Sequence, residues 1–185
     1  MEKLIECLTE LEKLKTVERG LNVGRRKEST AEHSWSCMLI ADILLDYIEE
    51  PLNRLKVLEF LLYHDLVEVY AGDAKFNNPE ELRVKDEKEK ASMEKIVSLL
   101  PRPRRYEEII EAYKSKASRE AQFAKAIDCL DSCVRNLNSE NRSGSDGFTE
   151  ALIREKYIPH VSMFEFIQDL FEAMMDTLKQ QNKVW

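Results

Sequence analysis

The sequence predicts an all-α helical bundle that forms a single domain over residues 1–185. Apolar residues recur at helical spacing, in segments that short polar stretches separate. The chain has only five Gly and five Pro, so it contains few turn signals. We find neither the alternation of a half-buried strand nor an internal repeat, and 185 residues are enough to bury the core of one domain.

The first predicted helix covers residues 2–16, which are amphipathic and charged throughout. Residues 17–28 contain two glycines and four cationic residues, and we expect a loop there. The sequence STAE at residues 29–32 is a capping-box pattern, in which Ser and Glu side chains bond to free backbone amides at the start of a helix. This helix should run to about Ile48 and stop near Pro51.

The next predicted helix spans residues 53–70 and ends at Gly72. The segment 138–147, NSENRSGSDG, has the strongest loop composition in the chain. We place His160, beside Pro159, in the loop before the last helix and expect no role for it. The remaining helices are expected at residues 79–100, 103–117, 119–137, 148–156 and 161–181.

The net charge of −7 and the isoelectric point near 5.2 disfavour nucleic acids and anionic membranes as partners, because both need a basic surface. The charged N-terminus argues against a signal peptide, and no apolar run approaches the roughly 20 residues of a bilayer span. We interpret the four cysteines as reduced core residues rather than as disulfides or metal ligands. These observations predict a cytoplasmic protein.

The segment LEFLLYHDLVEVYAGD begins at Leu58. Apart from His64, Asp65 and Glu68, it is almost continuously apolar up to Gly72. An isolated imidazole or carboxylate in such a helix costs several kcal/mol, so these groups must be paired or bind a metal. On a continuous helix, Glu68 shares a face with His64 and Asp65. The alternatives are that the His-Asp pair is satisfied within the core and that Glu68 bridges to a nearby Lys or Arg.

Two further residues complete a candidate ligand set. His33 follows the capping box directly, and Asp128 lies in the largely apolar helix AQFAKAIDCLDSCV with Asp131 one turn later. Two imidazoles and two carboxylates suit Mn, Fe, Co, Ni or Zn and leave coordination positions open. Taken singly, His33 could be a surface histidine, Asp128 a buried partner of an arginine, and Asp131 an acid behind the ligands or at the surface.

The order and spacing of these residues resemble the HD-domain superfamily of metal-dependent phosphohydrolases, in particular its 5′-deoxynucleotidase and oxetanocin-like branch. STAEHSW is similar to that branch's S-V-[AS]-[DE]-H-S block, LLYHDLVEVYAGD to its H-D-x-x-E-x-x-x-x-D block, and KAIDCLD to its K-x-[AV]-D-x-[IL]-[DE] block. The resemblance covers roughly residues 8–135. It is specific, because separate motifs occur in the family's order.

The resemblance implies a role for each matched residue. Glu68 corresponds to an acid/base carboxylate, and Asp73 to a carboxylate on the sugar side of the pocket. The basic segment before His33 corresponds to the family's phosphate-binding arginines, with Arg19 and Arg26 as candidates. The implied ligands are His33, His64, Asp65 and Asp128, which would hold a divalent metal cation such as Mn or Co, with Zn, Ni, Fe and Mg as alternatives.

The function implied by the resemblance is removal of the 5′-phosphate from (deoxy)nucleoside monophosphates by a metal-activated water. Many relatives have Trp beside the first arginine, near the sugar 2′ position, where this chain has Gly20-Leu21, so the preference for deoxyribose stays open. The alternatives are an HD-type nucleotide phosphodiesterase or pyrophosphohydrolase, and a non-catalytic nucleotide-binding helical module. A homodimer is expected, because relatives are commonly dimers and the last helix contains the apolar sequence FEFIQDLFEAMM.

Overall fold

Helices form nearly all the regular structure in the part of the chain that the computed structural model describes, residues 1–74, 78–139 and 149–184. Short 3₁₀ turns at Glu12–Thr16 and Leu45–Tyr47 extend the first two helices, and a small antiparallel sheet, β1 (Glu18–Val23) and β2 (Arg26–Ser29), lies between them. The all-α prediction is confirmed apart from this sheet. The α-helices are α1 (Glu2–Leu11), α2 (Thr30–Leu44), α3 (Arg54–Tyr63), α4 (Glu68–Ala71), α5 (Pro79–Leu99), α6 (Pro103–Ser115), α7 (Arg119–Asn138), α8 (Glu150–Val161) and α9 (Glu165–Gln180).

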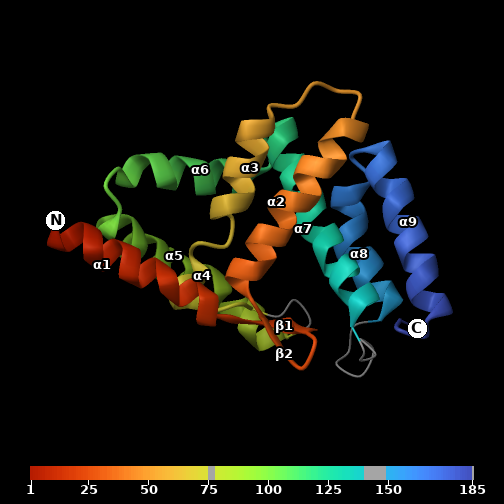
Figure 1. Ribbon diagram of the computed structural model, residues 1–185, viewed down its shortest axis with the longest axis horizontal. Helices are drawn as coiled ribbons and strands as arrows, with labels where there is room; N and C mark the ends of the chain where they lie inside the picture. Colours follow the sequence, from red (N-terminus) through yellow and green to blue (C-terminus); the bar gives the residue numbers. More distant parts are fainter. Residues whose placement is uncertain (75–77, 140–148, 185) are drawn as a thin grey trace.

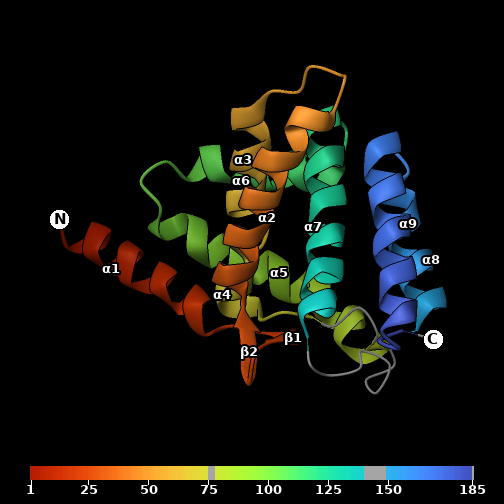
Figure 2. The ribbon, with the colours of Figure 1, turned by 45° about the vertical axis from the view of Figure 1, so that its right-hand side comes forward.

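Helix α7 lies at the centre of the main hydrophobic core (Figure 1). It contacts α2, α3, α6, α8 and α9, and the last two helices run side by side along it (Figure 2). Buried apolar surface stabilises a fold by roughly 25 cal/mol per Å², so this cluster is the main source of stability. The fully buried apolar residues of α7 are Ala121, Phe123, Ala124, Ala126, Ile127 and Leu130.

A smaller hydrophobic cluster forms where α1, α4, α5 and α6 meet, on the side of the molecule where the N-terminus lies (Figure 1). Its buried residues include Val67, Ile96 and Ile110. Tyr63, at the end of α3, packs against both this cluster and the main core. Tyr63 therefore connects the two clusters.

Side-chain caps determine where the site-bearing helices begin. Ser29 and Glu32 form the expected capping box at α2: the Glu32 amide donates to Ser29 Oγ (3.3 Å), and the Ser29 amide donates to Glu32 Oε2 (2.9 Å). At α7, Ser118 Oγ accepts a hydrogen bond from the Ala121 amide at 3.2 Å. Caps of this kind typically contribute about 1 kcal/mol to stability.

The prediction of a loop at residues 17–28 is wrong, because most of this segment forms the β1–β2 hairpin. Val23 pairs with Arg26 across a two-residue turn, in which Gly24 has a φ of 57°. Glycine suits such a turn because it adopts a positive φ without a steric penalty. The strands are short and their register shifts between Glu18 and Asn22, so the sequence shows no alternation. Contacts of β1 with α7 and of β2 with α2 stabilise the hairpin.

The prediction of one continuous helix over residues 53–70 is also wrong. Helix α3 ends one residue before His64, a turn follows, and α4 begins at Glu68. His64 Nδ1 donates to the Leu61 carbonyl oxygen at 2.8 Å, and the Glu68 amide reaches back only three residues, to the Asp65 carbonyl. This tighter turn interrupts the α-helical hydrogen bonding, so His64, Asp65 and Glu68 do not lie on one face of a continuous helix.

Helix α8 continues through Pro159, so His160 lies in this helix and not in a loop as expected. Proline has no backbone N–H, so the helix loses one hydrogen bond at this position, and this loss is small in the last turn. Beyond it, the Ser162 amide still donates to the Ile158 carbonyl at 3.1 Å. Most of the loop expected at residues 138–147 lies outside the described residues.

The four cysteines are buried and form no disulfide within the described residues, which agrees with their interpretation as reduced core residues. No helix in residues 1–74, 78–139 and 149–184 is long and apolar enough to cross a bilayer. Among the apolar residues of α9 that suggested a dimer interface, Phe171 and Met175 are buried in the chain's own core, whereas Phe166 is 37% exposed. The homodimer stays a prediction, and the buried residues do not support it.

Replacing Leu178 of α9 by alanine should destabilise the protein by about 2–5 kcal/mol, because a fully buried leucine leaves a cavity in the main core. Leu55→Ala makes the same chemical change at a residue that is 78% exposed, and should change the free energy of unfolding by less than about 0.5 kcal/mol. Urea denaturation followed by circular dichroism measures both values. Equal effects would contradict the burial of α9.

Candidate metal centre

Several elements bring the predicted ligands together beside the middle of α7. His33 lies in the first turn of α2, directly behind the capping box, and His64 caps the end of α3. Asp65 lies in the turn that follows, and Asp128 belongs to α7. His33 and Asp128 are 95 positions apart in the sequence, so only the packing of α2, α3 and α7 against one another creates this site.

The four side chains converge on one point. His33 Nε2 lies 3.2 Å from His64 Nε2 and 3.0 Å from Asp128 Oδ1. Asp65 Oδ2 lies 3.1 Å from His64 Nε2 and 3.6 Å from His33 Nε2. Ligand atoms of His33, His64 and Asp128 therefore lie within 4.8 Å of one another, and Asp65 Oδ2 approaches both imidazole nitrogens.

Hydrogen bonds on the far sides of both imidazole rings direct lone pairs toward this centre. His33 Nδ1 donates to Asp131 Oδ2 at 2.6 Å, and His64 Nδ1 donates to the Leu61 carbonyl oxygen at 2.8 Å. In the neutral rings each Nε2 then has no hydrogen, so two nitrogen lone pairs and two carboxylate oxygens face one another. Such an arrangement needs positive charge at its centre. The donor set fits a divalent transition-metal cation.

Asp131 lies directly behind His33. Its side chain is 1% exposed, and it accepts hydrogen bonds from His33 Nδ1 and from the Ser36 hydroxyl. A carboxylate in this position fixes the tautomer and the orientation of a metal-binding histidine. Of the two interpretations that the sequence leaves open for Asp131, the structure supports the acid behind the ligands.

Neighbouring basic side chains keep both ligand carboxylates ionised. Burial alone would raise the pKa of Asp65, but His64 and Arg19 hold that pKa below its usual value. Burial has the same tendency at Asp128, where the Lys125 ammonium holds the pKa well below the usual range. Ionised carboxylates are the form that binds a metal.

Cys37 approaches the same centre, but its chemistry is different. Its Sγ lies 3.6 Å from both ring nitrogens of His33. Burial raises the pKa of the Cys37 thiol to about 12, so the thiol stays protonated. Cys37 packs against His33, and its Sγ also lies within 4.8 Å of the candidate ligand atoms of His33, His64 and Asp128, so it is a further ligand candidate that the sequence interpretation did not include.

The centre opens into a cavity of about 540 Å³, a volume typical of small-molecule sites. His64, Asp65 and Asp128 form part of its wall, together with Glu68 and Asp73. Other parts of the wall come from α5, α6, α7 and α8 and contain Lys85, Lys114, Lys116, Lys125 and Lys156. The rest of the wall therefore contains more lysines than carboxylates, the latter being Asp86 and Glu89.

Arg19 reaches the centre from β1. Its guanidinium donates to Asp65 Oδ2 at 3.1 Å, and it lies 3.8 Å from Asp73 Oδ1 and 3.7 Å from Glu28 Oε2. Arg19 and Asp73 both line the cavity. The guanidinium is therefore held by carboxylates at the position where an anionic ligand would enter the centre.

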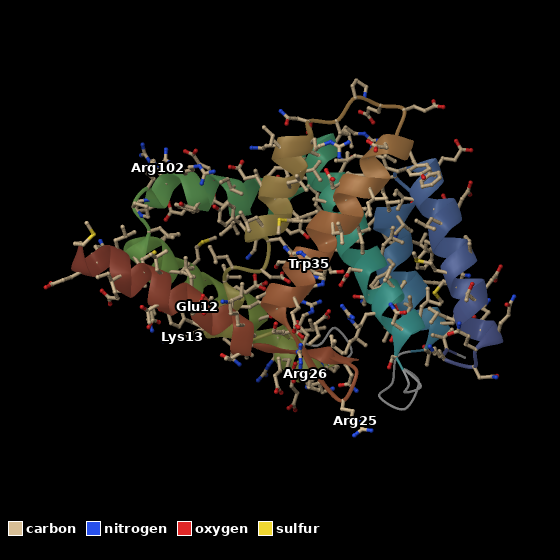
Figure 3. All side chains as sticks on the ribbon, viewed as in Figure 1. Glu12, Lys13, Arg25, Arg26, Trp35 and Arg102 are labelled. Atoms are coloured by element: carbon tan, nitrogen blue, oxygen red, sulfur yellow. The ribbon has the colours of Figure 1, made fainter. Side chains whose placement is uncertain are left out.

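Arg26, the second arginine candidate, lies on the outer edge of the hairpin, and Figure 3 shows it near Arg25 at the hairpin tip. Its guanidinium pairs with Glu32, and its side chain is 61% exposed. Arg26 does not belong to the described residues that line the cavity. The geometry favours Arg19 over Arg26 as the residue that meets a ligand.

Glu68 begins α4 and is only 5% exposed. The Thr30 hydroxyl, fully buried at the start of α2, donates to Glu68 Oε2 at 2.7 Å. Burial raises the pKa of Glu68 well above its usual value, and the Asp65 carboxylate raises it further. Glu68 therefore holds a proton more readily than a surface glutamate does.

Sequence reasoning missed two residues that contact Asp128. Lys125 Nζ donates to Asp128 Oδ2 at 2.7 Å, and the Tyr113 hydroxyl donates to the same oxygen at 3.2 Å. Lys125 carried a signal, because it precedes Asp128 by three positions on one helix. Tyr113 carried none, since it reaches the site only through the packing of α6 on α7. His160, expected to have no role, lines the cavity.

Residues 11–158, most of the chain, match the sequence profile of the HD domain, so this chain belongs to the HD-domain family. Among curated proteins, 5′-deoxynucleotidase HDDC2 of Homo sapiens is 33% identical over 132 residues, and the Bos taurus protein of the same name is 27% identical over 149 residues. The human match covers 68% of this chain but only 62% of the relative, and the bovine match covers 78% and 71%.

Solved structures show the same fold. A "Predicted metal-dependent phosphohydrolase" from Magnetospirillum magnetotacticum is 26% identical and superposes with a TM-score of 0.89, covering 99% of this chain and 94% of that chain. An HD-domain phosphohydrolase from Listeria innocua, 18% identical, superposes with a TM-score of 0.68 over 97% of this chain and 92% of that chain. These findings confirm the resemblance on which the sequence-based assignment rests.

The protein should bind Mn²⁺ or Co²⁺ at this centre, and His64→Ala and Asp128→Asn should each lose most of that binding, because each change removes a ligand atom. His160→Ala removes a histidine that lines the same cavity outside the ligand cluster, and should keep the wild-type metal content. Titration calorimetry and elemental analysis after dialysis measure the binding. Equal metal content in His64→Ala and His160→Ala would contradict the site.

Asp131→Asn should weaken metal binding about 10- to 100-fold. The uncharged amide is a weaker acceptor than the carboxylate, so it no longer fixes the tautomer of His33. The ring-nitrogen chemical shifts of His33 should change with it. Asp169→Asn makes the same substitution at an exposed position of α9 and should leave both measurements unaltered. Retained affinity with an unchanged tautomer in Asp131→Asn would show that the buried bond has no such role.

Proposed function

We propose that this protein is a metal-dependent phosphohydrolase that removes the 5′-phosphate from nucleoside monophosphates. The observation that carries the proposal is the convergence of two imidazole nitrogens and two carboxylate oxygens at the wall of a cavity that also contains Arg19. Membership in the HD-domain family supports the reaction class, and the relatives named 5′-deoxynucleotidase support the substrate class.

A divalent cation held by His33, His64, Asp65 and Asp128 would supply an activated water and neutralise phosphoryl charge. The chain's own residues bind and orient the substrate. The Arg19 guanidinium offers several N–H donors to phosphoryl oxygens, and its contacts with acidic side chains hold it beside the centre. Asp73, on the same part of the wall, is our candidate for accepting a hydrogen bond from a sugar hydroxyl.

The reaction needs a proton on the leaving group. Water forms a bond from its oxygen to phosphorus, the bond from phosphorus to the nucleoside 5′ oxygen breaks, and the proton that water loses is balanced by one that this oxygen gains. Glu68 is our candidate for the acid, because it lines the cavity while the Thr30 hydroxyl holds one of its oxygens. The products are a nucleoside and orthophosphate.

Incubation with dAMP, dGMP, dCMP, TMP or AMP in the presence of Mn²⁺, Co²⁺ or Mg²⁺ should release orthophosphate. His64→Ala and Asp65→Ala should lower kcat by about 10³-fold or more, because they remove metal ligands. Arg19→Ala should lower kcat/KM about 10- to 100-fold, whereas Arg26→Ala should change it less than about 3-fold, because Arg26 lies outside the cavity wall.

Product identity separates this proposal from its alternatives. Pyrophosphate released from a nucleoside triphosphate, or a mononucleotide released from a cyclic or diester substrate, would indicate a pyrophosphohydrolase or a phosphodiesterase. Wild-type turnover in His64→Ala would remove the metal-dependent mechanism altogether. Metal binding without turnover of any of these compounds would favour the non-catalytic nucleotide-binding module.

A further inference from the structure

Lys125 occupies a position beside the candidate metal centre that the proposed mechanism does not use. It lies on α7 one turn before Asp128, and its ammonium donates to Asp128 Oδ2 at 2.7 Å. The other oxygen of this carboxylate, Oδ1, faces His33 Nε2. The Lys125 side chain lines the cavity and remains 31% exposed, so a ligand in the cavity can reach its ammonium group.

Two cations from separate elements therefore flank the ligand carboxylates. Arg19 contacts Asp65 from β1, and Lys125 contacts Asp128 from α7. Both side chains line the same cavity, as do the two carboxylates that they contact. A phosphoryl group that meets the centre through this cavity comes within reach of both cations.

The local charge affects how a phosphoryl group binds. Asp65, Asp73 and Asp128 line this cavity, and a phosphomonoester dianion adds two more negative charges. Several lysines line the same cavity, and Lys125 contacts one of these carboxylates directly. The Arg19 guanidinium is shared among Asp65, Asp73 and Glu28, so its charge is already largely balanced. A phosphodiester carries a single negative charge and meets less repulsion from the same carboxylates.

We propose that the Lys125 ammonium binds a non-bridging oxygen of the substrate phosphoryl group from α7, while Arg19 binds the group from β1, and that this pair selects dianionic phosphomonoesters over monoanionic phosphodiesters. This inference rests on the proposed phosphohydrolase function and assigns the substrate class of the same site. It differs from a purely structural role, in which Lys125 would only hold Asp128 in place.

The test measures metal binding and phosphate binding separately on the full chain. Because Lys125 also contacts the metal ligand Asp128, the variants are compared at saturating Mn²⁺. Under this condition Lys125→Met should weaken the binding of orthophosphate to the Mn²⁺-loaded protein about 10- to 100-fold. Lys125→Arg keeps the charge and should recover part of that loss. Lys90→Met removes an exposed lysine of α5 and should match wild type in both titrations.

Turnover gives a second readout that a structural role would not produce. The ratio of kcat/KM for p-nitrophenyl phosphate to that for bis(p-nitrophenyl) phosphate should fall about 10-fold in Lys125→Met, because the lost cation matters more to a dianion than to a monoanion. A uniform loss for both esters would instead indicate misplacement of Asp128.

Three outcomes overturn the inference. Unchanged orthophosphate affinity in Lys125→Met shows that the ammonium does not contact the ligand, and leaves the proposed function intact. A loss of Mn²⁺ affinity that is accompanied by an equal loss for both esters at saturating Mn²⁺ shows that Lys125 only positions Asp128. If the wild-type protein binds Mn²⁺ but neither binds orthophosphate nor hydrolyses either ester, the proposed function fails together with the inference.

Discussion

The buried hydrogen bond from His33 Nδ1 to Asp131 is the interaction on which the rest of the site depends. It joins the first turn of α2 to the middle of α7, and both side chains are only 1% exposed. Because Nδ1 is engaged with Asp131, the neutral ring directs its Nε2 lone pair toward His64 and Asp128. A ring with the other tautomer would direct an N–H toward the same point and exclude a cation. The Ser36 hydroxyl holds the second oxygen of Asp131 and limits its rotation.

Helix α7 carries both the main core and the chemistry, which links the two. Most of its apolar residues are buried, while Lys125, Asp128 and Asp131 lie among them on one helix. Charges that are largely enclosed by apolar side chains are tolerated only when each one is paired. Here Lys125 pairs with Asp128, and Asp131 pairs with His33. Correct packing of α7 is therefore a condition for charge balance at the centre as well as for the stability of the core.

The sequence was sufficient where the determining interactions are local. The capping box at Ser29 and the helix starts near Pro79 and Pro103 depend on neighbouring residues, and the structure has them where they were predicted. The hairpin at residues 18–29 was missed because its pairing and its packing on α7 are tertiary effects. Tyr113 and the exposed position of Arg26 were equally invisible, since both follow from how distant elements pack.

The cavity has walls from both hydrophobic clusters of the fold. Glu68 and Glu89 come from α4 and α5, which pack in the smaller cluster, whereas Cys129 and Tyr157 come from α7 and α8 of the main core. A molecule that fills the cavity touches both parts at once, and its binding free energy adds to the contacts through Tyr63 that already connect them. A ligand that binds only the folded protein therefore stabilises the packing of the two clusters against each other.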